Sequence, residues 1–231
     1  MAKLKANSTK SQILALLKRS GGSSVDELTR ALGLASMTIR QHLTQLERDG
    51  LVDTREVRRA TGRPHFVYSL SPRGDETFPR RYDVLAELIL REVAALEPAD
   101  LAMLDSGGRQ ALVLERVAER VAADHRGRFE NKDLAQRVAL LTELLQEESG
   151  FAECEKTAEG WEVRDYNCAY HKLVDSNPNI CHWHLTLMQK LVGENVFHER
   201  SLCAGSECCR FVIEPQSIKA AAAPSAVATS V

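Results

Sequence analysis

Within its first 70 residues the chain changes from a helical to a strand-like hydrophobic period, and few folds accommodate that order. Three segments with apolar residues at three- and four-residue steps predict short helices over residues 9–20, 24–32 and 36–49. Alternating residues between 51 and 70 predict two strands, joined by a polar turn over residues 58–64. Three helices followed by a hairpin predict a winged helix-turn-helix.

Residues suited to capping mark where these helices begin. Thr9 and Ser36 are candidate N-caps of the first and third helices, because Ser and Thr hydroxyls accept hydrogen bonds from free backbone N–H groups. Ser24, with Glu27 three residues later, predicts a capping box on the second helix.

The third helix has the pattern of a recognition helix, which places its N-terminal residues against base edges in the major groove. Ile39, Leu43 and Leu46 are expected to face inward. The residues left for DNA are Ser36, Met37, Thr38, Arg40, Gln41 and Thr44. Arg40 can make a bidentate contact to guanine and Gln41 to adenine. We expect Ser36 and Thr38 to hold phosphates, Met37 to touch a thymine methyl or the backbone, and His42 to pack.

The predicted hairpin is rich in arginine, with Arg55, Arg58, Arg59 and Arg63 on or beside its turn. Guanidinium groups on a thin hairpin can follow the phosphates or enter the adjacent minor groove. Two alternatives stay open: the arginines form a solvated face, or the whole domain is a winged helix used for protein contacts.

Composition is that of an ordinary globular protein, with 44% hydrophobic residues and a net charge of −2. Lys and Arg are in excess over residues 1–82, and Asp and Glu over residues 83–231, which fits a nucleic-acid binder joined to a control domain. The polar start shows no secretory signal, and no apolar run approaches the roughly 20 residues that span a bilayer. We therefore expect a cytoplasmic protein with no membrane partner.

The middle of the chain is predicted to be helical, over residues 82–96 and around residues 110–123 and 132–147. In the first of these, Leu85, Leu88, Ile89 and Val93 form a stripe that offers either a dimer seam or core packing. Beyond residue 151 the pattern is mixed. It predicts strands at residues 161–163 and 210–213 and a helix over residues 182–192, followed by a low-complexity tail over residues 219–231.

Five of the six cysteines and four of the seven histidines lie between Cys168 and Cys209. Thiolates and imidazoles at that density suggest a soft metal or an iron–sulfur cluster. Cys168, Cys181 and Cys209 are too far apart in sequence for the close cysteine pairs of a zinc ribbon. As ligands of one centre, they would come from separate loops. In a cytosolic protein such cysteines are metal ligands or thiols more often than disulfides.

The sequence resembles SufR-type iron–sulfur regulators, bacterial repressors of the genes for iron–sulfur cluster assembly. The shared motifs are Tyr166-Asn167-Cys168, Asn177-Pro178-Asn179-Ile180-Cys181 and Cys208-Cys209-Arg210-Phe211, with Gly62-Arg63-Pro64 in the wing. The resemblance spans about residues 9 to 215, and the three-cysteine spacing is its specific part.

This resemblance implies a [4Fe-4S] or [2Fe-2S] cluster on Cys168, Cys181 and Cys209. It also implies a homodimer that binds operator DNA with the cluster and releases it without. The fourth ligand is left open among Cys203, Cys208, His171, His184 and His198. A weaker fourth donor would leave one iron more labile than four thiolates do, which suits a sensor.

Several of these residues also have ordinary structural explanations. Cys154 is expected to be a small buried residue, and Cys203 or Cys208 could each be a plain thiol. Of His182 and His184, which flank Trp183, at least one is expected to be structural. Trp161 and Trp183 fit a core better than a binding box.

Taken together, the sequence predicts an α+β protein. Its parts are a winged helix-turn-helix over residues 1–80, a helical linker and dimerisation region over 81–149, a mixed α/β cysteine-rich sensor domain over 150–215, and a disordered tail over 216–231. The expected function is a cluster-sensing repressor rather than an enzyme. Alternatives are a repressor that responds to zinc or another metal and, with less support, a thiol enzyme, for which no triad or phosphate loop is evident.

Overall fold

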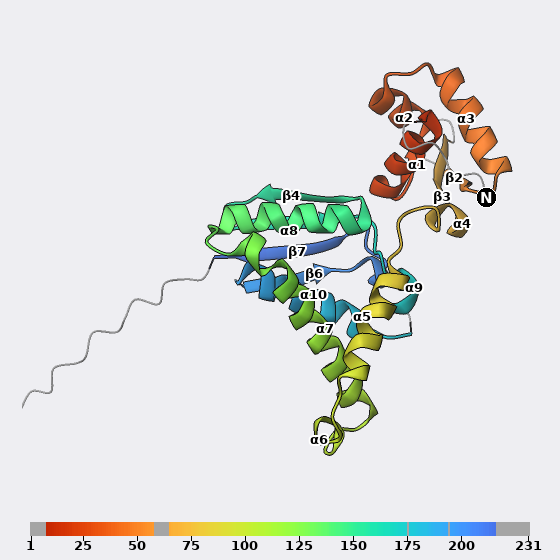
Figure 1. Cartoon of the computed structure of the whole chain (residues 1–231). Coiled ribbons are helices and arrows are strands. Elements are labelled where there is room, and N and C mark those ends of the chain that lie inside the picture. Colours follow the sequence, from red (N-terminus) through yellow and green to blue (C-terminus); the bar gives the residue numbers. More distant parts are fainter. Residues whose placement is uncertain (1–7, 58–64, 175, 194, 216–231) are drawn as a thin grey trace, which may run out of the picture.

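The computed structural model describes residues 8–57, 65–174, 176–193 and 195–215. It has the predicted α+β class: a winged helix-turn-helix at the N-terminus, helices in the middle and a sheet toward the C-terminus (Figure 1). The predicted tail and the whole predicted turn of the wing, residues 58–64, lie outside the described residues.

The N-terminal domain has three helices and a small antiparallel sheet. The helices are α1 (Thr9–Ser20), α2 (Val25–Leu32) and α3 (Ser36–Arg48). The strands are β1 (Ser23–Ser24), β2 (Val52–Val57) and β3 (His65–Leu70), in the order β1-β3-β2. Their own hydrophobic core includes Ile39, Leu43 and Leu46, as predicted, together with Ile13 and Leu17 of α1.

Two predicted caps are wrong by one residue. Ser8, not Thr9, is the extended residue before α1, and its hydroxyl accepts a hydrogen bond from the Ser11 backbone N–H at 3.2 Å. Ala35 precedes α3 in an extended conformation, so Ser36 is already helical and does not cap it. The Ser24–Glu27 capping box is confirmed in both directions.

Helix α4 (Pro72–Asp75) follows the winged domain and contacts β3. Most of the remaining described chain packs around a second core. The elements that follow α4 are α5 (Tyr82–Ala94), α6 (Pro98–Leu101), α7 (Ser106–Phe129), α8 (Leu134–Ser149), β4 (Ala152–Lys156), β5 (Trp161–Asp165), α9 (His171–Val174), α10 (Asn179–Val192), β6 (Asn195–Arg200), the short 3-10 turn η1 (Leu202–Ala204) and β7 (Cys209–Glu214). The four strands form an antiparallel sheet in the order β4-β5-β7-β6. Helices α8 and α10 lie against it, and α7 packs along α10 (Figure 1).

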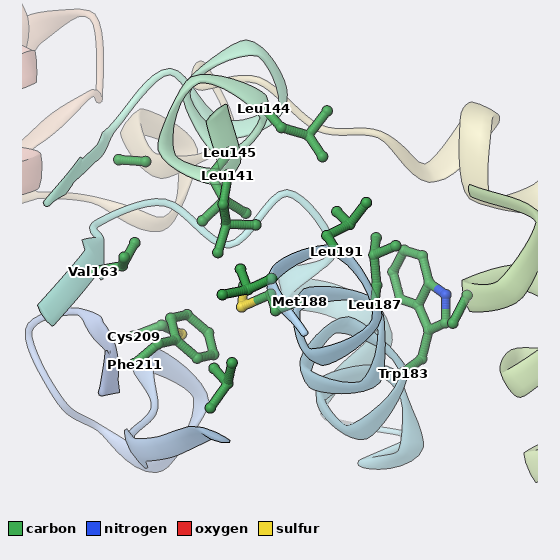
Figure 2. Close-up of a cluster of buried hydrophobic side chains, with 14 of the residues drawn as sticks. Leu141, Leu144, Leu145, Val163, Trp183, Leu187, Met188, Leu191, Cys209 and Phe211 are labelled. Atoms are coloured by element: carbon green, nitrogen blue, oxygen red, sulfur yellow. The ribbon is translucent and has the colours of Figure 1, made fainter. Parts of the chain in front are cut away.

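Helices and sheet share this core. The side chains labelled in Figure 2 come from α8 (Leu141, Leu144, Leu145), from α10 (Trp183, Leu187, Met188, Leu191) and from the sheet (Val163, Cys209, Phe211). Trp183 is 2% exposed and Trp161 packs against the same cluster, as expected of core residues. The predicted middle helices and the cysteine-rich segment thus bury their apolar faces together.

Sequence patterns missed strands β4 and β6, and one expected burial is wrong. Cys154 is exposed, because β4 is an edge strand of which only Ala152 is buried. The long helices occur where they were expected, although α7 runs from Ser106 to Phe129 and α10 begins at Asn179, both beyond the predicted limits.

The apolar stripe of α5 is divided. Leu85 is buried and Leu88 and Ile89 pack against the core of this chain, whereas Val93 is 48% exposed beside the exposed Leu90. Most of the stripe therefore serves core packing. Within the described part of the chain, no helix combines the length and apolarity needed to span a bilayer.

Candidate functional site

Helix α3 presents one polar face to solvent. Because Ile39, Leu43 and Leu46 are buried, the opposite face exposes Arg40, Gln41 and Thr44. Ser36 and Met37 at its N-terminus are also exposed, Met37 by 67%, and Thr38 is half-buried. His42 is half-buried at the border, where packing was expected. The residues predicted to contact DNA thus lie on one accessible helix surface.

The wing is described only up to its turn. Arg55 is exposed on β2, whereas Arg58, Arg59 and Arg63 lie outside the described residues. On β3, Phe66 is 53% exposed, a residue that the sequence patterns did not select.

The cysteines expected to bind a cofactor converge from three elements. Cys181 is in the first turn of α10, Cys209 opens β7, and Cys168 lies in the loop between β5 and α9. Cys168 and Cys209 line one cavity. The Cys181 side chain hydrogen-bonds that of Cys203, and both thiols lie close enough to Cys209 to affect its ionisation.

The surroundings of Cys181 and Cys209 favour their protonated forms. Its hydrogen bond to Cys203, together with burial, raises the pKa of Cys181 far above its ordinary value. Burial raises the pKa of Cys209 to about 12. Because a thiolate is the form that binds metal, loading the site would release protons and replace these hydrogen bonds with metal–sulfur bonds.

A buried acid–imidazole group borders the same cavity. His184 Nε2 lies 3.6 Å from Glu148 Oε2. Burial disfavours the charged form of His184, but its contact with Glu148 prevails and raises its pKa. Burial also raises the pKa of nearby Asp165 to about 6. His184 is therefore held by a carboxylate, a role closer to the expected structural histidine than to an open ligand.

Two further candidate ligands have surroundings of their own. Cys208 is the residue before β7; burial raises its pKa, and the charges that act on it include those of Arg164, Glu162 and Arg200. The His198 ring stacks on Phe211 with centroids 4.5 Å apart, and its buried Nε2 has no hydrogen-bond partner among the described residues.

The donor set fits a soft metal or an iron–sulfur cluster, because it gathers thiols and an imidazole in a partly buried place. The cavity between Cys168 and Cys209 measures about 20 Å³, room for about one water molecule. Among the described residues, no three His, Cys, Asp or Glu side chains are placed to hold one metal ion. Binding a cluster would therefore require this cavity to enlarge.

The Cys168 loop is tied to the segment that leads into the DNA-binding domain. Arg80 donates from Nη1 to the side-chain oxygen of Asn167 and, at 3.2 Å, to the backbone carbonyl of Cys168. Its Nη2 reaches Asp75 Oδ2, and Asp75 also pairs with Lys18 of α1. One guanidinium therefore links the loop of an expected ligand to a helix of the winged domain.

A second contact joins the same two parts. Arg19 at the end of α1 pairs with Glu153 of β4 at 2.8 Å and lies over the rings of Phe151 and Tyr166. Phe78 packs edge-on against Phe151, with centroids 5.1 Å apart. Sequence patterns did not reveal this junction, since its residues are distant in the chain and form no motif.

Comparison with known proteins identifies the N-terminal domain. Residues 7–53 match the family of winged helix-turn-helix DNA-binding domains. The N-terminal domain is a winged helix-turn-helix. The winged helix-turn-helix predicted from three helices and a hairpin is thus confirmed. No protein with a curated description matches the chain.

Two solved structures show weak likeness. One is a transcriptional regulator homologue from Pyrococcus horikoshii, with 26% identity over 31% of this chain and 70% of that chain, at a TM-score of 0.28. The other is Bacillus subtilis PadR in complex with operator DNA, with 20% identity over 80% of this chain and 89% of that chain, at a TM-score of 0.27.

Proposed function

We propose that this protein is a transcriptional repressor whose affinity for operator DNA depends on an iron–sulfur cluster bound by Cys168, Cys181 and Cys209. The observation that carries the proposal is the convergence of these three cysteines, from separate elements, beside a loop that hydrogen-bonds to the base of a DNA-binding domain. The resemblance to SufR-type regulators supports an iron–sulfur cluster as the cofactor. It also supports the genes for iron–sulfur cluster assembly as the targets of repression.

On the DNA side, α3 would enter the major groove and Arg40 and Gln41 would contact base edges. Their neighbours Ser36, Thr38 and Thr44 would hold phosphates or the edges of adjacent bases, and the arginines of the wing would follow the backbone. As a homodimer, the protein would present two such helices at a spacing that matches two half-sites.

On the sensing side, Cys168, Cys181 and Cys209 would bind as thiolates after giving up their protons. A bound cluster would supply an iron–thiolate centre that iron scarcity or oxidants can remove. The buried Glu148–His184 pair lines the same cavity and would hold the Cys168 loop in position.

Arg80 would connect the sensing side to the DNA side. It hydrogen-bonds the Cys168 carbonyl and pairs with Asp75, which in turn pairs with Lys18 on α1, so a shift of the Cys168 loop would move this chain of contacts. The Cys168 loop and α1 would then adopt one arrangement when the thiolates bind the cluster and another when the cluster is lost. A coupling of this kind is worth about 1–3 kcal/mol, or roughly 5- to 150-fold in DNA affinity.

The test starts with the full-length protein purified without oxygen. Iron and acid-labile sulfide in similar amounts, with the visible absorption of iron–thiolate charge transfer, are the expected result. Stoichiometric zinc without sulfide would instead establish the metal-responsive alternative. Duplexes selected from a random pool by the loaded protein would then define the operator, and failure to enrich any sequence would contradict DNA recognition.

A further inference from the structure

Three cysteines leave a fourth ligand position to be filled. The candidate residues for this position differ in their surroundings. Cys208 lies among Arg164, Glu162 and Arg200. His184 is engaged by Glu148 at 3.6 Å and stacks on Trp183. Cys208 thus lies away from the three thiols, whereas His184 lines the same cavity as Cys168 and Cys209 but is held there by Glu148.

Cys203 lies among those thiols. It is in the turn η1, where its backbone N–H donates to Ser201 Oγ at 3.2 Å and fixes the direction of the turn. Its side chain packs against the main core and hydrogen-bonds Cys181. This contact joins a sulfur of η1 to a sulfur of α10, from cysteines that are about 20 residues apart in the sequence.

The same loop delivers a second sulfur. The Cys209 thiol receives a hydrogen bond from the Leu202 backbone N–H, next to Cys203, and is close enough to both Cys203 and Cys181 to feel their charge. Residues 202–209 thus form a short loop that brings two thiols toward the first turn of α10.

An imidazole supports this position from the other side. His171 Nδ1 at the start of α9 lies 3.8 Å from Cys203 Sγ. A ring nitrogen at that distance can orient the sulfur, as outer-shell groups do around metal ligands. His171 follows Cys168 by three residues, so its position depends on the same loop.

We propose that Cys203 is the fourth protein ligand, with His171 as the residue that positions its sulfur. The inference rests on the proposed function and departs from the three-cysteine pattern that the resemblance implies. It makes the site a four-thiolate centre, the usual complement for a cluster. Sensitivity to iron loss would then not depend on a weak fourth donor.

The experiment compares Cys203→Ser with Cys208→Ser, a matched control one residue from a ligand. Each full-length variant is reconstituted without oxygen with ferrous iron and sulfide. Bound iron per monomer and the rate of iron loss to a chelator are measured, and far-UV circular dichroism confirms folding. We expect Cys203→Ser to lose most of its iron or to release it about tenfold faster or more, and Cys208→Ser to behave as wild type.

A second variant tests the positioning role without removing a sulfur. His171→Gln should retain its iron content and release iron about tenfold faster. Wild-type iron content and release rate in Cys203→Ser would overturn the assignment, and so would equal losses in Cys203→Ser and Cys208→Ser. Loss in His198→Ala but not in Cys203→Ser would move the fourth ligand to β6. Failure of the wild-type protein to take up iron would overturn the proposed function itself.

Discussion

Arg40 is the residue of α3 that we expect to contact a guanine, because its side chain is exposed and a guanidinium can pair with that base through two hydrogen bonds. Arg40→Ala should weaken binding to the selected operator by about tenfold or more and relax the preference for guanine at one position. Fluorescence anisotropy against a guanine-substituted series measures both effects. Arg91→Ala, an exposed arginine on α5 paired only locally with Glu87, is the control and should leave affinity unchanged.

Ser24 gives a residue-scale test of the winged domain. Its hydroxyl accepts a hydrogen bond from the Glu27 backbone N–H, and the Glu27 carboxylate accepts one from the Ser24 backbone N–H. Ser24→Ala should lower the free energy of unfolding by about 1 kcal/mol, because one N–H group of α2 loses its partner. Urea denaturation followed by circular dichroism measures the loss. An unchanged midpoint would show that the box contributes nothing.

At the residue scale, local chemistry could be predicted where the pattern is local. The Ser24–Glu27 box and the inward Ile39, Leu43 and Leu46 follow from spacing along one helix. The contact of Cys203 with Cys181 could not, because it joins residues that only the folded loops bring together. Conversely, Cys154 looks like a core thiol until β4 is known to be an edge strand.

At the scale of elements, the open face of the C-terminal sheet is stabilised by an ion-pair network. Glu162 of β5 is buried between Arg164 of its own strand and Arg210 of β7. The Arg210 hydrogen bond, followed by that of Arg164, lowers the pKa of Glu162. The folded-state pKa is below the unfolded one, so the pairing stabilises the fold above the unfolded pKa and is lost as pH falls through the folded pKa.

Glu162→Gln should therefore cost about 2 kcal/mol at pH 7, less than a fully buried pair because both arginines are a third exposed. The difference from wild type should shrink as pH falls from the ordinary pKa of an unfolded glutamate, about 4.3, through the lower folded-state pKa of Glu162. Denaturation midpoints at several pH values measure this. Glu155→Gln, which removes an exposed partner of Arg164, is the control and should stay within about 0.5 kcal/mol. A Glu162→Gln deficit independent of pH would contradict the electrostatic explanation.

Long helices could be predicted from the sequence and short strands could not. Helices α7 and α8 carry apolar residues at helical steps over many turns. Strand β6 has only Val196 buried, and β4 only Ala152, so neither shows the alternation that marks a strand. Their partners along the sheet, not their own patterns, determine them.

At the scale of the whole molecule, the junction between the two cores is where sensing would reach DNA binding. Arg80 is nearly buried there and bridges Asp75, Asn167 and the Cys168 carbonyl. Arg80→Gln should abolish the dependence of DNA affinity on iron loading while leaving iron content close to wild type, because no ligand is removed. Arg91→Gln is the matched control and should keep the dependence. Unchanged iron dependence in Arg80→Gln would exclude this junction as the route.

In the proposed mechanism, one centre of cysteine sulfurs controls the affinity of the winged domain for its operator. The most direct measurement is the anisotropy of one labelled operator duplex titrated with anaerobic protein before chelation, after chelation, and after reconstitution with iron and sulfide. We predict an affinity that falls about tenfold or more on chelation and returns on reconstitution. Equal affinity in all three titrations would contradict the account.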